Sequence, residues 1–140
     1  MSELRKLRED HATLARLFGR LRSIIAARRP PAQLLLFDLR RELTSTLIAH
    51  LKLEDWALYP RLIESGDAAI SDAGREFQEE MGGLAPAFVA YCDRWSASAI
   101  EQDWAGYCAD TAGILDALEN RLLRENRDLL PLLDRLDRAA

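Results

Sequence analysis

The sequence predicts an all-α protein, an up-down-up-down four-helix bundle, from three observations. Apolar residues recur at alternating steps of three and four, which is the period of a helix with one buried face. Three short corners interrupt this pattern, and no stretch shows the alternation typical of a β-strand. Helices joined by short corners are antiparallel neighbours, so the chain is expected to run up and down four times.

Each helix can be placed from its interruptions. The first is expected over 2–28, because the Pro30-Pro31 pair cannot continue it. The second runs from these prolines to about Glu64, before a Ser-Gly-Asp turn. Pro60 lies inside the second helix and predicts a kink or a tightened turn there.

The second half of the chain repeats this organisation. The third helix resumes at Ser71 and is weakened at Gly82-Gly83. The last corner is expected near 98–102, and the fourth helix follows it. No linker is long enough to separate two domains, so residues 1–140, a usual length for one domain, are expected to form one.

Composition excludes several classes of protein. The 19 Lys and Arg residues are mixed with 23 Asp and Glu residues. Because the sequence has no basic stripe interleaved with aromatic residues, a nucleic-acid partner is not expected. No apolar run approaches the ~18 residues of a membrane span, so no membrane association is expected. The charged N-terminal stretch lacks the apolar core of a signal peptide, which predicts a cytoplasmic location.

Two cysteines, Cys92 and Cys108, are too few and too far apart for a disulfide framework or a CxxC motif. They are expected to be small, reduced residues of the core. Both lie at similar distances from the last corner, so a reversible disulfide between them stays open.

Charged and polar side chains occupy positions on the predicted buried faces. These residues are His11, His50, Glu54, Glu80, Arg121 and Glu125. In antiparallel helices, residues equidistant from a corner lie side by side. This rule places four of these residues, one from each helix, at a single level: His11, His50, Glu80 and Arg121. Glu54 and Glu125 follow one turn later, ~6 Å along their helices. Buried charge is costly unless it is paired or bound to a metal, so this level predicts a site.

A related sequence segment occurs twice in the chain. HLKLEDWALYP, which begins at His50, aligns with RLLRENRDLLP, which begins at Arg121, at a constant offset of 71 residues. His-x3-Glu puts an imidazole and a carboxylate on one helical face, where both can reach one cation. Such ligands suit iron, manganese or zinc.

HLKLEDWALYP, together with the single His of the first helix, resembles the hemerythrin-like (HHE cation-binding) domains over essentially the whole chain. The resemblance implies two irons inside a four-helix bundle, held by histidines of all four helices and bridged by two carboxylates. Carried over position by position, it implies His11, His50, Glu54 and Glu125 as metal ligands. Glu80 and Arg121 stand where the third and fourth helices would supply a histidine, and Leu84 stands where oxygen carriers add another.

The retained ligands belong to one half of such a two-metal site, and an arginine cannot ligate a cation. Two main hypotheses follow, and a two-metal site stays open as a third. In one, a single metal, iron or else manganese or zinc, is bound by His11, His50, Glu54 and Glu125. In the other, no metal is bound. We also hypothesise that the guanidinium of Arg121 replaces the second metal as the positive charge among Glu54, Glu80 and Glu125.

These hypotheses imply different functions. A metal-binding protein would act in oxygen, nitric oxide, redox or iron sensing, with a small ligand at the metal. A metal-free scaffold would serve a protein partner or regulation. The sequence offers no serine–histidine or cysteine–histidine constellation, which favours a binding protein over an enzyme, while oxidase-like reactivity at an iron stays open.

Overall fold

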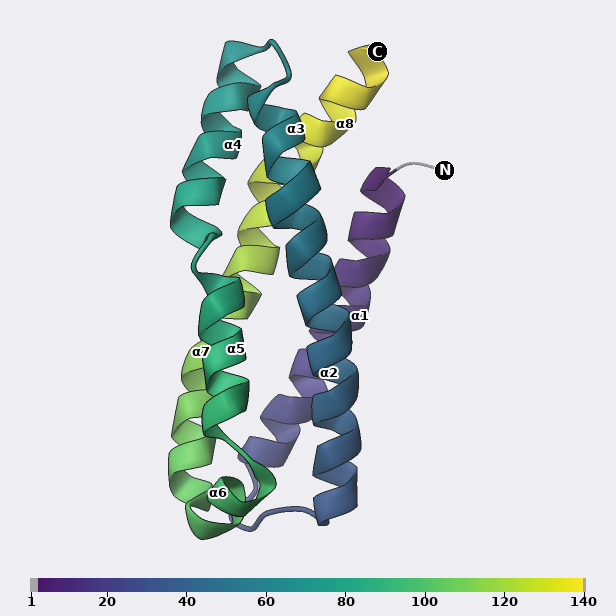
Figure 1. The fold of residues 1–140 in the computed structure, drawn as a ribbon. Coiled ribbons are helices and arrows are strands. Elements are labelled where there is room, and N and C mark those ends of the chain that lie inside the picture. The colour runs from purple at the N-terminus through teal and green to yellow at the C-terminus, as the bar shows by residue number, and fades with distance from the viewer. Residues whose placement is uncertain (1–2, 140) are drawn as a thin grey trace.

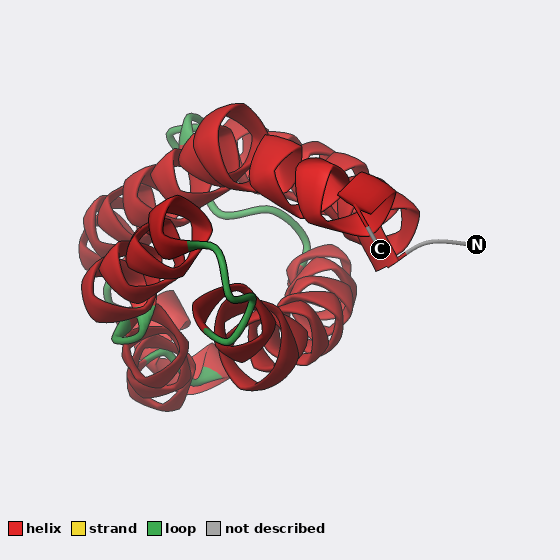
Figure 2. Cartoon of the chain, turned by 90° about the horizontal axis from the view of Figure 1, so that it is seen from above, coloured by secondary structure: helices red, strands yellow, loops and turns green. Residues whose placement is uncertain are grey.

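The computed structural model describes residues 3–139, and Ser2, the expected start of the first helix, lies outside them. Four antiparallel rods, each a single helix or a series of consecutive helices, form the bundle (Figures 1 and 2). This arrangement confirms the predicted fold class. The first two rods are α1 (Glu3–Ile25) and the continuous series α2 (Gln33–Leu53), η1 (Glu54–Leu58) and α3 (Tyr59–Ile63). The third and fourth are α4 (Ala68–Met81) with α5 (Leu84–Arg94), and α7 (Trp104–Arg124), η2 (Glu125–Leu129) and α8 (Leu130–Ala139). A short helix, α6 (Ala97–Gln102), occupies the last corner.

The corners use local polar groups to start new helices. Asp67 accepts a hydrogen bond from the backbone N–H of Ile70 at the start of α4. Ser96 and Asp103 begin α6 and α7 in the same way. These side chains satisfy backbone donors that have no partner inside the helix. Gly66 provides the positive φ of 83° that ends the second rod.

One π-helical turn widens the second rod and another the fourth, at equivalent places. In η1 the N–H of Tyr59 donates to the carbonyl of Glu54, and in η2 the N–H of Leu130 donates to that of Glu125. Pro60 and Pro131 follow directly, and a proline has no N–H with which to continue the ordinary helical pattern. The distortion expected at Pro60 is therefore a π turn, and each turn opens on a glutamate of the predicted site.

The third rod is interrupted where its glycines predicted weakness. α4 ends at Met81 and α5 begins at Leu84, so Gly82 and Gly83 form a turn between them (Figure 1).

The apolar core consists of two clusters. One contains Leu14, Leu47 and Leu118, and the other contains Leu7, Leu58 and Leu129. His11, His50, Glu54, Arg121 and Glu125 are also buried, and along their rods they lie between members of the two clusters. A polar layer thus separates two apolar ones.

Within residues 3–139, none of the helices combines the length and the hydropathy that crossing a membrane requires. Cys92 and Cys108 are free thiols that are half-buried, and they do not lie fully in the core, where the sequence had predicted them to be.

Candidate metal centre

Two histidines and two glutamates meet at the centre of the bundle. His11 comes from α1 and His50 from α2, while Glu54 and Glu125 begin η1 and η2. One ligand atom from each of the four lies within 4.8 Å of the others, and all four side chains are buried. The structure therefore brings together the four positions that the sequence predicted as ligands.

The imidazoles face the carboxylates through their Nε2 atoms. Nε2 of His11 lies 3.2 Å from Oε2 of Glu54 and 3.2 Å from Oε1 of Glu125. Nε2 of His50 lies 3.0 Å from the same Oε2 of Glu54. The two rings stand edge to face, with 4.8 Å between their centroids.

The other oxygen of each glutamate faces Arg121. Nη2 of Arg121 donates to Oε1 of Glu54 at 3.0 Å, and Nε donates to Oε2 of Glu125 at 3.3 Å. Each carboxylate thus connects the histidine pair on one side to a guanidinium on the other. This is the arrangement that two bridging carboxylates would have between two cations, with the guanidinium in one cation's place.

Arg121 is held by further contacts. Its Nη2 also donates to Oδ1 of Asp55 at 3.0 Å, and its Nη1 donates to the backbone carbonyl of Met81 at 3.1 Å. Met81 ends α4, where Gly82 and Gly83 interrupt the rod and leave carbonyls without helical partners. The ring of Tyr59 lies under the guanidinium, 5.3 Å from Cζ.

Two buried atoms of the cluster have unmet bonding capacity. Nε2 of His50 and Oε1 of Glu125 have no hydrogen-bond partner among residues 3–139, although each has an ionisable neighbour within 3.2 Å. These contacts are close but poorly aligned, as expected of atoms that point at a common centre rather than at each other. Unsatisfied buried polar groups are rare, and here they fit a cation bound between them.

Outer residues fix how the imidazoles are oriented. Nδ1 of His50 lies 3.0 Å from Oδ2 of Asp10, and Nδ1 of His11 lies 2.6 Å from Oδ1 of Asn126. Both partner oxygens accept hydrogen bonds, so each Nδ1 carries a proton and each Nε2 is left to offer its lone pair to a cation. Tyr59 similarly donates to Oε2 of Glu125 at 2.5 Å.

Without a metal, the cluster is a set of coupled charges. Burial lowers the pKa of His11, but contacts with Glu125 and Glu54 outweigh it and raise that pKa to about 10. Burial likewise opposes charge on His50, and Glu54 and Asp10 together raise its pKa. Burial raises the pKa of Glu54, but the contacts with both histidines outweigh burial and hold that pKa below its usual range. Burial and the negative charge of Glu54 together raise the pKa of Glu125.

The expected inward position of Glu80 is wrong. Glu80 is exposed and accepts a hydrogen bond from Arg124 on the surface. The corners predicted its height along the helix, but Glu80 is not among the buried positions of α4, which are Ile70, Ser71, Gly74, Phe77 and Met81. Arg121 therefore pairs with Asp55, and not with Glu80, in addition to Glu54 and Glu125.

Sequence reasoning also missed residues of the site. Asp10, Asn126 and Tyr59 follow or precede buried positions in the sequence, and nothing in the apolar pattern marks them. The repeat held one usable signal, since Asp55 and Asn126 occupy equivalent places directly after the two glutamates.

The family model of the hemerythrin HHE cation-binding domain matches residues 2–133. A buried histidine–glutamate cluster in a bundle of antiparallel helices defines the class to which such domains belong. This chain belongs to the hemerythrin HHE cation-binding family. No curated protein and no solved structure gives a significant match.

Proposed function

We propose that this protein binds one divalent metal ion, preferably iron, at His11, His50, Glu54 and Glu125. The observation that carries the proposal is the convergence of two Nε2 atoms and two carboxylate oxygens, two of them without hydrogen-bond partners. Two imidazoles and two carboxylates suit iron, with manganese or zinc as the alternatives.

The charges of the centre support one ion rather than two. Glu54, Glu125 and Asp55 carry three negative charges against the single positive charge of Arg121. With neutral imidazoles, the remaining two negative charges match one divalent cation. A second cation beside these carboxylates would have to occupy the place of the guanidinium, which cannot lose its charge.

A bound iron would supply a position for a small ligand such as dioxygen or nitric oxide. The protein's own contribution would be to orient both imidazoles, exclude bulk water and fix the charge opposite the metal through Arg121. We propose on this basis a role in oxygen, nitric oxide, redox or iron sensing. The cytoplasmic location stays a prediction.

Metal analysis of protein purified without chelator, and again after anaerobic reconstitution with ferrous iron, tests the proposal. One equivalent of metal per chain is expected, and His50→Ala should lose it. Glu80→Gln is the matched control and should retain it, because Glu80 lies on the surface. Metal far below one equivalent after reconstitution would contradict the proposal.

A second function is favoured by Arg121 itself. Its guanidinium already gives Glu54, Asp55 and Glu125 a counter-charge, so one half of the centre is complete without any metal. We propose as the alternative a metal-free scaffold that binds a protein partner. It predicts that a chelator leaves the melting temperature of the purified protein unchanged, whereas a large fall would exclude it.

A further inference from the structure

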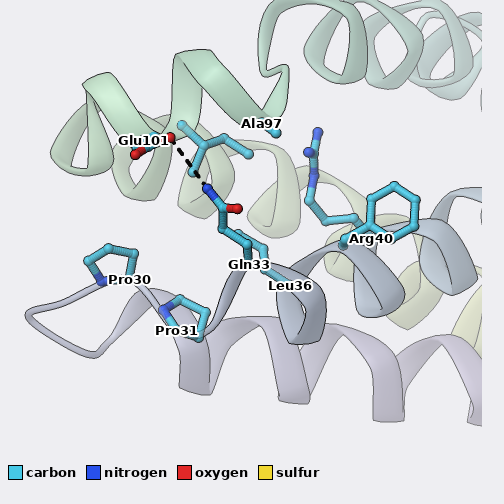
Figure 3. A pocket seen from close by; sticks show the side chains of 9 residues that line it. Pro30, Pro31, Gln33, Leu36, Arg40, Ala97 and Glu101 are labelled. Atoms are coloured by element: carbon cyan, nitrogen blue, oxygen red, sulfur yellow. Dashed lines mark hydrogen bonds between the residues drawn. The ribbon is translucent and has the colours of Figure 1, made fainter.

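A pocket of about 230 Å³ lies at the end of the bundle where α2 begins and α6 fills the corner (Figure 3). Leu36, which lines it, is fourteen residues from His50, so the pocket lies ~20 Å along α2 from the candidate metal centre. Nothing in the proposed metal chemistry uses it.

The walls of the pocket are mainly apolar. Leu36 and Ile100 are buried beneath it, and the Pro30-Pro31 pair and Ala97 form its sides. Phe37 also lines it and is 58% exposed, which is unusual for a large apolar side chain. Concave apolar sites with a few polar groups are typical of small-molecule binding.

One of the polar groups is a guanidinium without a carboxylate partner. Arg40 is half-buried; it donates from Nη2 to the backbone carbonyl of Trp95 at 2.6 Å and lies over the ring of Tyr107. Among residues 3–139, no carboxylate lies within ion-pair distance of it. Arg22 and Arg61, by contrast, each pair with two carboxylates. A guanidinium has five donors, so Arg40 keeps most of its capacity for an anion.

The opposite end of the pocket is closed by a neutral–acidic pair. Nε2 of Gln33 donates to Oε2 of Glu101 at 3.3 Å. Gln33 and Arg40 both extend from α2 toward the segment that carries Ala97 and Glu101 (Figure 3). Seven residues separate Gln33 from Arg40, or ~10 Å along the helix, so an anion at Arg40 would be well separated from Glu101.

We propose that this pocket binds a small apolar monocarboxylic acid. Its carboxylate would pair with Arg40, and its apolar tail would cover Leu36, Phe37 and Ile100. The pairing would give the half-buried guanidinium a full counter-charge, and the tail would remove the exposed face of Phe37 from water.

Calorimetric titration with octanoate, and with octanol as the uncharged probe of the same length, tests the proposal. Octanoate is expected to bind with a stoichiometry of one. Arg40→Gln should weaken octanoate by about tenfold or more, because it removes charge-assisted hydrogen bonds, and should change octanol by less than about twofold. Arg41→Gln is the matched control, since Arg41 is the exposed neighbour that does not line the pocket, and it should change neither.

A second variant fills the pocket without disturbing the core. Ala97 is exposed on the pocket wall, so Ala97→Phe should weaken octanoate and octanol together while the melting temperature is retained. The proposal is overturned if the wild-type protein shows no saturable octanoate binding at millimolar concentration. It is also overturned if Ala97→Phe leaves octanoate binding unchanged, or if Arg40→Gln and Arg41→Gln weaken it equally.

Discussion

Four oxygen acceptors surround the guanidinium of Arg121, and three of them are carboxylates. A buried charge of this kind does not by itself show high stability, because desolvation offsets much of the attraction. Removing one partner has a clear consequence, however, since the buried carboxylates then lose their counter-charge. Arg121, the residue that we propose in place of a second cation, is therefore also expected to contribute to the stability of the fold.

Arg121→Gln is expected to lower the free energy of unfolding of the metal-free protein by about 3–5 kcal/mol, because Glu54 and Glu125 lose the guanidinium and keep only the histidines as positive neighbours. Urea unfolding at neutral pH measures it. Arg124→Gln is the control three residues away, where the partly exposed pair with Glu80 is expected to contribute at most about 1 kcal/mol. Equal effects of the two substitutions would contradict this account of Arg121.

Asp10 acts on the centre through His50. Asp10→Ala is expected to weaken metal binding by about 10–100-fold, because Nδ1 of His50 then loses the acceptor that keeps it protonated and leaves Nε2 free. Competition with a coloured chelator measures the affinity. Glu9→Gln changes the charge at the exposed neighbouring position and should leave the affinity unaltered.

At the scale of elements, the two π turns decide where the carboxylates lie. Each glutamate opens a wide turn that a proline follows, and the second copy has the same geometry although Arg121 stands at the place that corresponds to His50. The repeat therefore conserves backbone shape at both places while the chemistry of the two halves differs.

Pro60→Ala supplies a backbone N–H that can donate to the carbonyl of Trp56 and restore an ordinary helical turn. Glu54 should then move out of line with His11 and His50, so metal stoichiometry or affinity should fall while circular dichroism still reports a helical bundle. Pro86→Ala, in the first turn of α5 where an N–H is unsatisfied anyway, should have no such effect. Full metal binding by Pro60→Ala would contradict the proposed role of the π turn.

The sequence predicted the level of the site better than its rotation. Corner positions fix heights along antiparallel helices, and His11, His50 and Arg121 do lie around the same carboxylate, that of Glu54. Glu80 failed because apolar residues at steps of three and four leave the rotational phase ambiguous beside the Gly82-Gly83 turn. Asp10 and Tyr59 could not be found, because their role depends on which neighbouring helix each side chain contacts, whereas the repeat offered a signal for Asn126.

At the scale of the whole molecule, the polar layer between the two apolar clusters links the stability of the bundle to protonation. His11 has a pKa of about 10 when folded against 6.5 as its ordinary value, so its protonation favours the folded state fully below about pH 6.5. This stabilisation is lost as pH rises toward 10. The raised pKa of His50 acts in the same direction.

The melting temperature of the metal-free protein is therefore expected to fall between pH 7 and pH 10, and His11→Gln should make this fall shallower. A bound metal requires unprotonated imidazoles, so the metal-loaded protein should also lose less stability over this range. Thermal unfolding across the pH series, with and without chelator, measures both effects. A fall of the same size in the wild-type protein and in His11→Gln would contradict the assignment to His11.

Arg121 differs in one lasting respect from the second cation that we propose it replaces: it is covalently attached to the chain. A chelator cannot extract it, an oxidant cannot change its valence, and another metal cannot exchange with it. The carboxylates on that side keep their counter-ion through scarcity or excess of metal. In the proposed metal-binding protein, only the histidine side of the centre would then respond to the supply of metal.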